Sequence, residues 1–147
     1  MTRSGNSIVE TIARLGAAEL LEVIQGAGGR VSPVGRGTAA RIVITLPRGA
    51  FAPVAQAIME RAVELKWQLL QLLGREPLAG WPADVMPPLW WDEMVTGFGS
   101  ALIEARRSVC GNCRYPVAVC WLRRVPGQRR RVRTWSCPRC GRRCEGS

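Results

Sequence analysis

The sequence predicts an α+β fold in which a small helix–β-hairpin–helix module is followed by a cysteine-rich β-hairpin. Within residues 7–74, apolar side chains recur at helical spacing on both sides of a stretch in which apolar and polar residues alternate. Near the C-terminus, two C-x-x-C pairs enclose two further alternating stretches. We therefore expect three segments: the module over 7–74, a proline- and tryptophan-rich arm with a connecting helix over 75–107, and a cysteine-rich segment over 108–147.

The module is expected to open with two short helices. Ser7 and Glu10 have the spacing of a capping box, so the first helix is expected to begin at Ser7. Gly16 interrupts the helical pattern, which resumes over Ala17–Gln25 and stops at the glycine-rich run 26–29. The side chains expected to face the core are Ile8, Ile12, Leu15, Leu20, Leu21 and Ile24.

A β-hairpin is expected next, with strands over Arg30–Val34 and Ala40–Leu46. Pro33 lacks a backbone N–H group, so the first strand is placed at a sheet edge. The second strand has the alternation of a half-buried strand. Its inward positions are Ile42, Ile44 and Leu46, and its outward positions are Arg41, Val43 and Thr45.

The longest helix signal covers Phe51–Leu73, and Gly74 is well placed to end it. Its apolar residues recur at alternating steps of four and three, which would suit the seam of a homodimer. Packing of this stripe on the hairpin and the first helix is the favoured interpretation, because helices of globular proteins have the same spacing. The stripe consists of Phe51, Ala55, Ile58, Ala62, Leu65, Leu69 and Leu72.

Prolines and glycines make residues 74–88 a linker or an extended arm. Trp81, Trp90 and Trp91 argue against a free tether, because large apolar rings normally need cover. We expect the arm to lie against one of the domains. The pattern over Asp92–Arg107 predicts a helix that leads into the first cysteine pair.

Cysteine spacing gives the strongest chemical signal in the chain. Cys110 and Cys113 form one C-x-x-C pair, and Cys137 and Cys140 form the other. Two such pairs can bring four thiolates to the corners of a tetrahedron, the geometry that structural Zn²⁺ prefers. A site of this kind has no open position for water or substrate, so the one zinc ion is expected to be structural. A redox dithiol and a disulfide scaffold are the alternatives.

Between the two pairs, strands are expected over Tyr115–Val125 and Arg129–Ser136, around a Pro126-Gly127 turn. Each C-x-x-C pair is expected to form a tight turn around the metal, called a knuckle. In the order knuckle, hairpin, knuckle, residues 108–141 resemble the zinc-ribbon family. The segment Cys137-Pro-Arg-Cys140-Gly141 matches the second knuckle of that family. The chain contains no histidine, so the site has to be Cys₄. Of the two remaining cysteines, Cys144 is the better substitute ligand, and Cys120 is expected to be a small buried residue.

The net charge of +10 arises entirely within residues 101–147, which points to a polyanion or an acidic partner. Arginines beside an indole suit nucleic acid, whose phosphates set the affinity while the ring stacks on a base. An acidic protein partner is the alternative, and so is a solvated rim of arginines with both ribbon tryptophans, Trp121 and Trp135, packed inward. The candidate nucleic-acid-binding residues are Arg123, Arg124, Arg129, Arg130, Arg131, Arg133 and Trp135.

Residues 17–74 resemble the TubC-type N-terminal docking domain. The resemblance rests on three stretches: Ala18–Gly29, Arg41–Phe51 with its Pro47-Arg-Gly-Ala50 junction, and the leucine-rich helix that ends at Leu73. It implies an αββα(α) module, often dimeric, that recruits a partner segment against its hairpin. Similar domains are attached to replication-type proteins of mobile elements, and the exposed candidates for contact are Arg30, Arg36 and Arg41.

These features predict a non-enzymatic adaptor. Without histidine, metal-hydrolase and histidine-based nucleophilic schemes are excluded, and the glycine-rich runs lack the Gly-Lys-Ser/Thr signature of a phosphate loop. No apolar run has the length of a membrane span, so we expect a cytoplasmic protein. The predicted function is an accessory protein for replication or transcription on a mobile element, which binds nucleic acid through its ribbon and a partner protein, or itself, through the module. The alternative is a pure docking adaptor whose basic ribbon binds an acidic partner.

Overall fold

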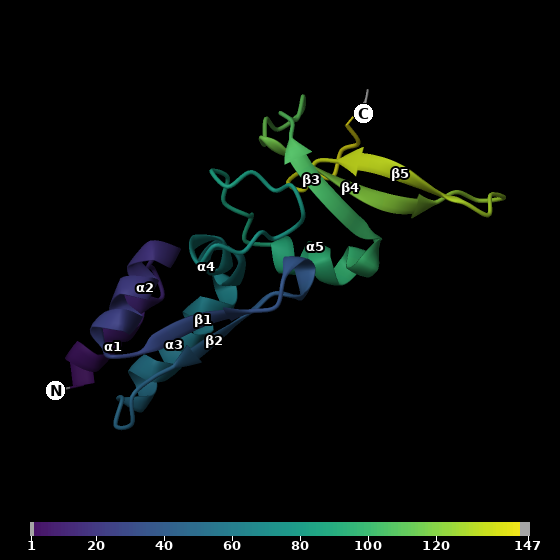
Figure 1. The fold of residues 1–147 in the computed structure, drawn as a ribbon. Coiled ribbons are helices and arrows are strands. Elements are labelled where there is room, and N and C mark those ends of the chain that lie inside the picture. Colours follow the sequence, from purple (N-terminus) through teal and green to yellow (C-terminus); the bar gives the residue numbers. More distant parts are fainter. Residues whose placement is uncertain (1, 145–147) are drawn as a thin grey trace. The chain divides into compact units, whose positions relative to one another are not determined.

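The computed structural model describes residues 2–144 and divides the chain into two compact units (Figure 1). The first unit comprises the chain up to Gly35 together with Ala39–Arg75, and the second comprises Arg36–Thr38 and the chain from Glu76 onward. The architecture is mixed α+β with two small antiparallel sheets. Positions 145–147 of the predicted cysteine-rich segment lie outside the described residues. Over the part of the chain that is described, every helix is too short or too polar to traverse a bilayer.

Two short helices, α1 (Thr2–Ile12) and α2 (Ala17–Gly26), open the first unit. The interruption at Gly16 and the end of α2 at the glycine run are as predicted. The predicted start at Ser7 is wrong, because α1 is already helical from Thr2. The Ser7 carbonyl accepts a hydrogen bond from Thr11 Oγ1 at 2.8 Å, an i to i+4 contact typical of a helix interior.

The predicted hairpin is confirmed as an antiparallel pair of strands, β1 (Arg30–Val34) and β2 (Arg41–Thr45). The short 3₁₀ turn η1 (Gly37–Ala39) lies between them. In both strands the exposed and half-buried positions alternate, so one face of this two-stranded sheet packs inward. The inward-facing side chains are Val31, Pro33, Ile42 and Ile44.

The predicted long helix is divided into α3 (Ala52–Glu64) and α4 (Lys66–Leu72) by a non-helical backbone at Leu65, where φ is −103° and ψ is 15°. Both segments still direct the central part of the apolar stripe into the core of this unit, together with α1, α2 and the hairpin. Packing within the unit, the favoured interpretation, is therefore confirmed for these positions. The ends of the stripe differ, because Phe51 is 62% exposed and Leu72 is 42% exposed.

The second unit contains α5 (Trp91–Phe98), the 3₁₀ turn η2 (Gly99–Ala101) and three strands, β3 (Leu102–Arg107), β4 (Val117–Arg124) and β5 (Arg131–Ser136). The strands form one antiparallel sheet in the order β3-β4-β5. The prediction of a continuous helix over 92–107 is wrong in its second half. Gly99 adopts a φ of +54°, which ends the helix, and residues 102–107 then satisfy their backbone groups by pairing with β4.

The arm before α5 is held against the sheet, as the tryptophans predicted. Trp81 and Trp91 are buried, and their ring centroids lie 5.0 Å apart. The backbone N–H of Ala105 in β3 donates to the Ala79 carbonyl at 2.7 Å. A β-carbon on Gly80, whose φ is +84°, would collide with the Ala105 carbonyl oxygen, so this close approach requires glycine.

Candidate metal centre and basic ribbon

The first knuckle is a tight backbone turn around the thiol of Cys110. The Arg114 N–H donates to the Cys110 carbonyl at 2.9 Å, and the Cys110 N–H donates to the Tyr115 carbonyl at 2.9 Å. The Asn112 N–H points at Cys110 Sγ at 3.4 Å. Arg114 closes the turn with a φ of +64°, a left-handed conformation that side chains other than glycine rarely adopt.

The second knuckle repeats this geometry residue by residue. The Gly141 N–H donates to the Cys137 carbonyl at 2.8 Å, and the Cys137 N–H donates to the Arg142 carbonyl at 2.8 Å. The Arg139 N–H lies 3.4 Å from Cys137 Sγ. Gly141 has a φ of +78° and therefore occupies the left-handed position that Arg114 occupies in the first knuckle. The two C-x-x-C segments thus present their sulfurs in equivalent ways.

These knuckles bring the four cysteine sulfurs together. The Sγ atoms of Cys110, Cys113, Cys137 and Cys140 all lie within 4.8 Å of one another. The Sγ atoms of Cys110 and Cys140 are 3.6 Å apart, and those of Cys113 and Cys137 are 3.4 Å apart. A tetrahedral ion with metal–sulfur bonds of about 2.3 Å would hold its sulfurs about 3.8 Å apart. The cluster therefore fits a metal ion such as zinc with little rearrangement.

The surroundings of Cys110 favour its thiolate form, whereas the surroundings of Cys137 oppose it. The backbone N–H groups of Cys113 and Asn112 lower the pKa of Cys110 to about 6. Burial raises the pKa of Cys137 to about 12. A cation would have to displace the proton from Cys137 on binding, since thiolates and not thiols are the ligands.

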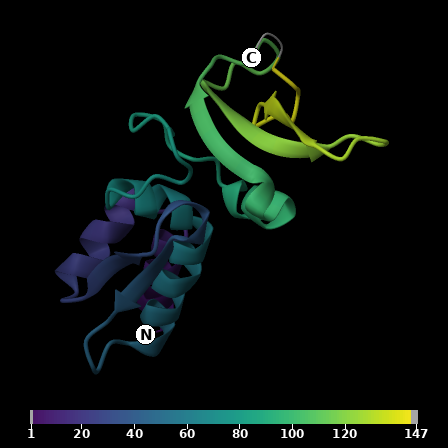
Figure 2. The ribbon, with the colours of Figure 1, turned by 45° about the vertical axis from the view of Figure 1, so that its right-hand side comes forward.

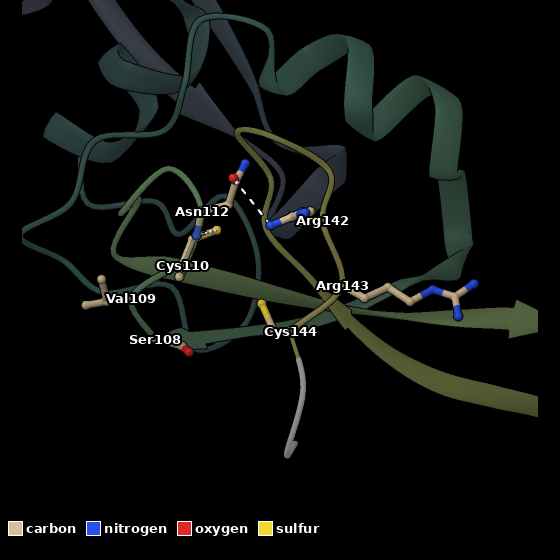
Figure 3. A pocket seen from close by; sticks show the side chains of 8 residues that line it. Ser108, Val109, Cys110, Asn112, Arg142, Arg143 and Cys144 are labelled. Carbon is tan, nitrogen blue, oxygen red and sulfur yellow. Dashed lines mark hydrogen bonds between the residues drawn. The ribbon is translucent and has the colours of Figure 1, made fainter.

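Cys120 and Cys144 do not belong to this group of four. Cys120 is fully buried in the middle of β4, as predicted, and burial raises its pKa. Cys144 lies at the edge of a polar cavity of about 640 Å³, which Cys110 and Arg142 also line. Figure 3 shows the side chains of Cys110, Arg142 and Cys144 around this cavity, with the side chain of Arg143 extended away from them.

Neighbouring segments of the second unit hold both knuckles in place. The Trp90 indole N–H donates to the Pro138 carbonyl at 3.0 Å, between the cysteines of the second knuckle. The Tyr115 hydroxyl donates to the Met86 carbonyl at 3.0 Å, next to the first knuckle. The arm therefore contacts both ends of the cysteine cluster, a role that cysteine spacing does not indicate.

The arginines predicted to bind nucleic acid all lie on the β4–β5 hairpin. Strand β3 pairs with β4 no farther along than Trp121, whereas β4 and β5 stay paired up to Arg124 and Arg131. Residues 122–133 therefore form a two-stranded extension, which we call the distal ribbon (Figure 2). It contains six arginines and no acidic residue: Arg123, Arg124, Arg129, Arg130, Arg131 and Arg133.

The structure separates the two tryptophans of the hairpin. Trp121 faces α5, with its ring centroid 5.0 Å from that of Phe98 and its indole N–H bonded to Ser136 Oγ at 3.0 Å. Trp135 lies on the opposite face, where the Arg106 guanidinium carbon is 4.0 Å from the ring centroid. This contact has the geometry of a cation–π pair.

Sequence reasoning missed Arg106 and Glu104 because their strand was expected to be a helix. Glu104 forms an ion pair with Arg133 at 3.6 Å, so the charge of Arg133 is partly compensated within the sheet. A strand interpretation of residues 102–107 would have placed Glu104 and Arg106 on one face by parity, and this signal was present in the sequence.

No family model, no curated protein and no solved structure matches the chain. The resemblances to the zinc-ribbon family and to the TubC-type docking domain accordingly rest on the residues that carry them.

Arg114 and Gly141 occupy the left-handed position of the first and the second knuckle, so substitutions at these residues test whether the two knuckles are equivalent. Gly141→Ala should destabilise the metal-loaded protein by about 1 kcal/mol, because a side chain at positive φ is strained. There is free space around this site, so the backbone would be the only cause. Arg114→Gly should be neutral or slightly stabilising, since relief of strain opposes the greater entropy of the unfolded chain. Chemical denaturation measures both.

Gly111→Ala is the matched control, because a β-carbon there meets nothing within 4 Å and no positive φ is involved. It should change the free energy of unfolding by less than about 0.5 kcal/mol. Equal effects of Gly111→Ala and Gly141→Ala would contradict the assigned turn geometry.

Proposed function

We propose that the protein is a non-enzymatic adaptor whose C-terminal unit is a Cys₄ zinc ribbon that binds nucleic acid. The observation that carries this proposal is the position of the four-sulfur cluster at the base of a ribbon with six arginines and no acidic residue. A metal ion at the base would fix the two knuckles, and through them the direction of the ribbon. Arginines held on a fixed scaffold are suited to phosphate groups, although Glu104 partly compensates the charge of Arg133.

Zinc is the ion that this donor set suits best. Four thiolates select soft or borderline cations, and closed tetrahedral Cys₄ sites are typical of structural zinc. The ion would supply folding free energy and no reaction chemistry, since its coordination would be complete. The role of Cys110, Cys113, Cys137 and Cys140 is therefore to hold the second unit together.

For the first unit we propose recruitment of a protein partner or of a second copy of the chain. The resemblance to the TubC-type domain supports this, together with the outer face of the hairpin, where Arg30, Val34, Arg41 and Val43 are exposed. An accessory role in replication or transcription on a mobile element is the setting that this resemblance suggests.

A salt titration tests the nucleic-acid role. The full-length, metal-loaded protein should bind generic nucleic acid with a dissociation constant of roughly 10⁻⁶–10⁻⁴ M at physiological salt, and the affinity should fall steeply as salt rises. Replacement of Arg129, Arg130 and Arg131 by glutamine should lower the slope of log K against log salt by about 2.7, since each phosphate contact contributes about 0.9. Fluorescence anisotropy with labelled oligonucleotides measures both quantities.

A variant of the first unit with the same loss of charge is the control. Arg30, Arg41 and Arg48 are exposed, and their replacement by glutamine removes three charges as well. If both triple variants weaken binding equally, net charge and not the ribbon is responsible. If the unmodified protein binds no nucleic acid with a measurable salt dependence, the alternative function gains support: a docking adaptor whose basic ribbon binds an acidic protein.

A further inference from the structure

The shape of the distal ribbon restricts the kind of nucleic acid that it can bind, which its positive charge alone does not. Beyond the last residue paired with β3, strand β4 continues through three residues, 122–124, which at about 3.3 Å each gives a reach of roughly 10 Å, and residues 125–130 connect it to β5. Only two strands are present along this length, so the ribbon is about 5 Å wide between its backbones. It is a narrow projection and not a flat platform.

Arginines lie on both faces of this projection. The register pairs Arg124 with Arg131 and Leu122 with Arg133, and these residues share one face. Arg123 pairs with Val132 on the opposite face. Arg129 and Arg130 extend the charge to the end of the ribbon, where both are exposed. Cations that point in opposite directions suit a ligand with phosphates on two sides.

Stacking of single-stranded bases has little support here. The distal ribbon contains no aromatic residue. Trp121 faces α5, and one face of the Trp135 ring is covered by Arg106. Proteins that bind single strands usually combine a basic groove with exposed rings on which bases stack. The distal ribbon offers the charge without such rings.

Building on the proposed function, we infer that the distal ribbon binds double-stranded DNA by entering the major groove of the B-form helix. That groove is about 12 Å wide and 8.5 Å deep and admits a two-stranded β-ribbon. A reach of roughly 10 Å exceeds this depth, and arginines on both faces can contact the phosphates of both strands. The minor groove, about 6 Å wide, is too narrow for the ribbon once side chains are added to the roughly 5 Å between its backbones, and the major groove of A-form RNA is too narrow as well.

The decisive experiment compares nucleic acids of equal sequence and length with the full-length, metal-loaded protein. Fluorescence anisotropy should show binding to a DNA duplex about tenfold tighter than to the RNA duplex or to the single DNA strand. RNA is the critical comparison, because its charge density is at least as high while its major groove is deep and narrow. A DNA duplex whose cytosines carry bulky glucosylated hydroxymethyl groups, which fill the major groove, should bind about tenfold more weakly than the unmodified duplex.

Single substitutions on opposite faces provide the second test. Arg123→Gln and Arg124→Gln should each weaken duplex binding about fivefold near physiological salt, because each removes one phosphate contact with a salt slope of about 0.9. Metal content measured for each variant verifies that the unit is intact. If only one of the two substitutions has an effect, the ligand lies against one face and groove entry is wrong.

The outcomes separate this inference from the function on which it depends. Equal affinity for the RNA duplex, tighter binding of the single strand, or indifference to glucosylation would each overturn groove entry while nucleic-acid binding remains. Binding to none of these ligands, including a case in which only an acidic protein is bound, would overturn both.

Discussion

Removal of the metal ion by a strong chelator should unfold the second unit and leave the first unit folded. Structural zinc in small domains contributes an apparent 10–16 kcal/mol at neutral pH, which exceeds the stability of most small domains. The second unit has three short strands, and within β4 only residues 117–120 are fully buried. Two knuckles with four converging thiols cannot stay together without the cation once repulsion between thiolates develops.

Tryptophan fluorescence can follow this unfolding. Trp67 is the only tryptophan of the first unit, and the other five belong to the second unit: Trp81, Trp90, Trp91, Trp121 and Trp135. In a Trp67→Phe variant, all emission therefore reports on the second unit. Chelation should shift the emission to longer wavelength, and addition of Zn²⁺ should reverse the shift. Elemental analysis should find one ion per chain before chelation.

Single substitutions of cysteine test which sulfurs bind the metal ion. Cys113→Ser should abolish stoichiometric metal binding and reproduce the chelated state, because the cluster loses one of its four sulfurs. Cys144→Ser should retain the ion, since Cys144 lies outside the group of four. Full metal content in Cys113→Ser, or loss of the ion in Cys144→Ser, would mean that the ligand set is wrong.

Acid should release the ion as well. Protons compete with the cation for the thiolates, so the affinity for metal falls as the pH falls. The N–H groups of Cys113 and Asn112 lower the pKa of Cys110 to about 6, whereas burial raises that of Cys137 to about 12. Binding at neutral pH consequently releases a proton from Cys137, and each drop in pH opposes that release.

The part of the candidate site that sequence predicts best is the part fixed by short-range geometry. The C-x-x-C spacing brings two sulfurs together within each knuckle, and the alternating strands between the pairs bring the knuckles together. Glycine positions and alternation likewise predict the end of α2 and the β1–β2 hairpin, since both depend on local backbone preferences.

The parts that sequence does not predict depend on tertiary contacts. Leu102–Arg107 contains leucine, alanine, glutamate and arginine, all good helix formers, yet the segment pairs with β4 as a strand. Two tertiary contacts override that local preference: pairing with the edge of the β4–β5 hairpin, and the Ala79 carbonyl of the arm, which accepts a hydrogen bond from the Ala105 N–H. The break at Leu65 is similar, because two shorter helices direct Ile58 and Leu69 into one core.

The first unit should be most sensitive to truncation of its central leucine. Leu20 on α2 is fully buried in the core cluster, between apolar side chains of α1, α3 and α4. Leu20→Ala should reduce the free energy of unfolding by about 2–5 kcal/mol, since it removes apolar contacts and leaves a cavity. Urea denaturation followed by Trp67 fluorescence measures this loss, in a background in which phenylalanine replaces the tryptophans of the second unit that tolerate it.

Leu72→Ala is the matched control for this prediction, because the chemical change is the same and the side chain is 42% exposed. It should cost less than about 1 kcal/mol, as alanine also favours the helix. Neither substitution removes a cysteine of the cluster, so both variants should bind one ion per chain. Similar losses for Leu20→Ala and Leu72→Ala would contradict the core assigned to this unit, because only a buried leucine leaves a cavity when it is shortened.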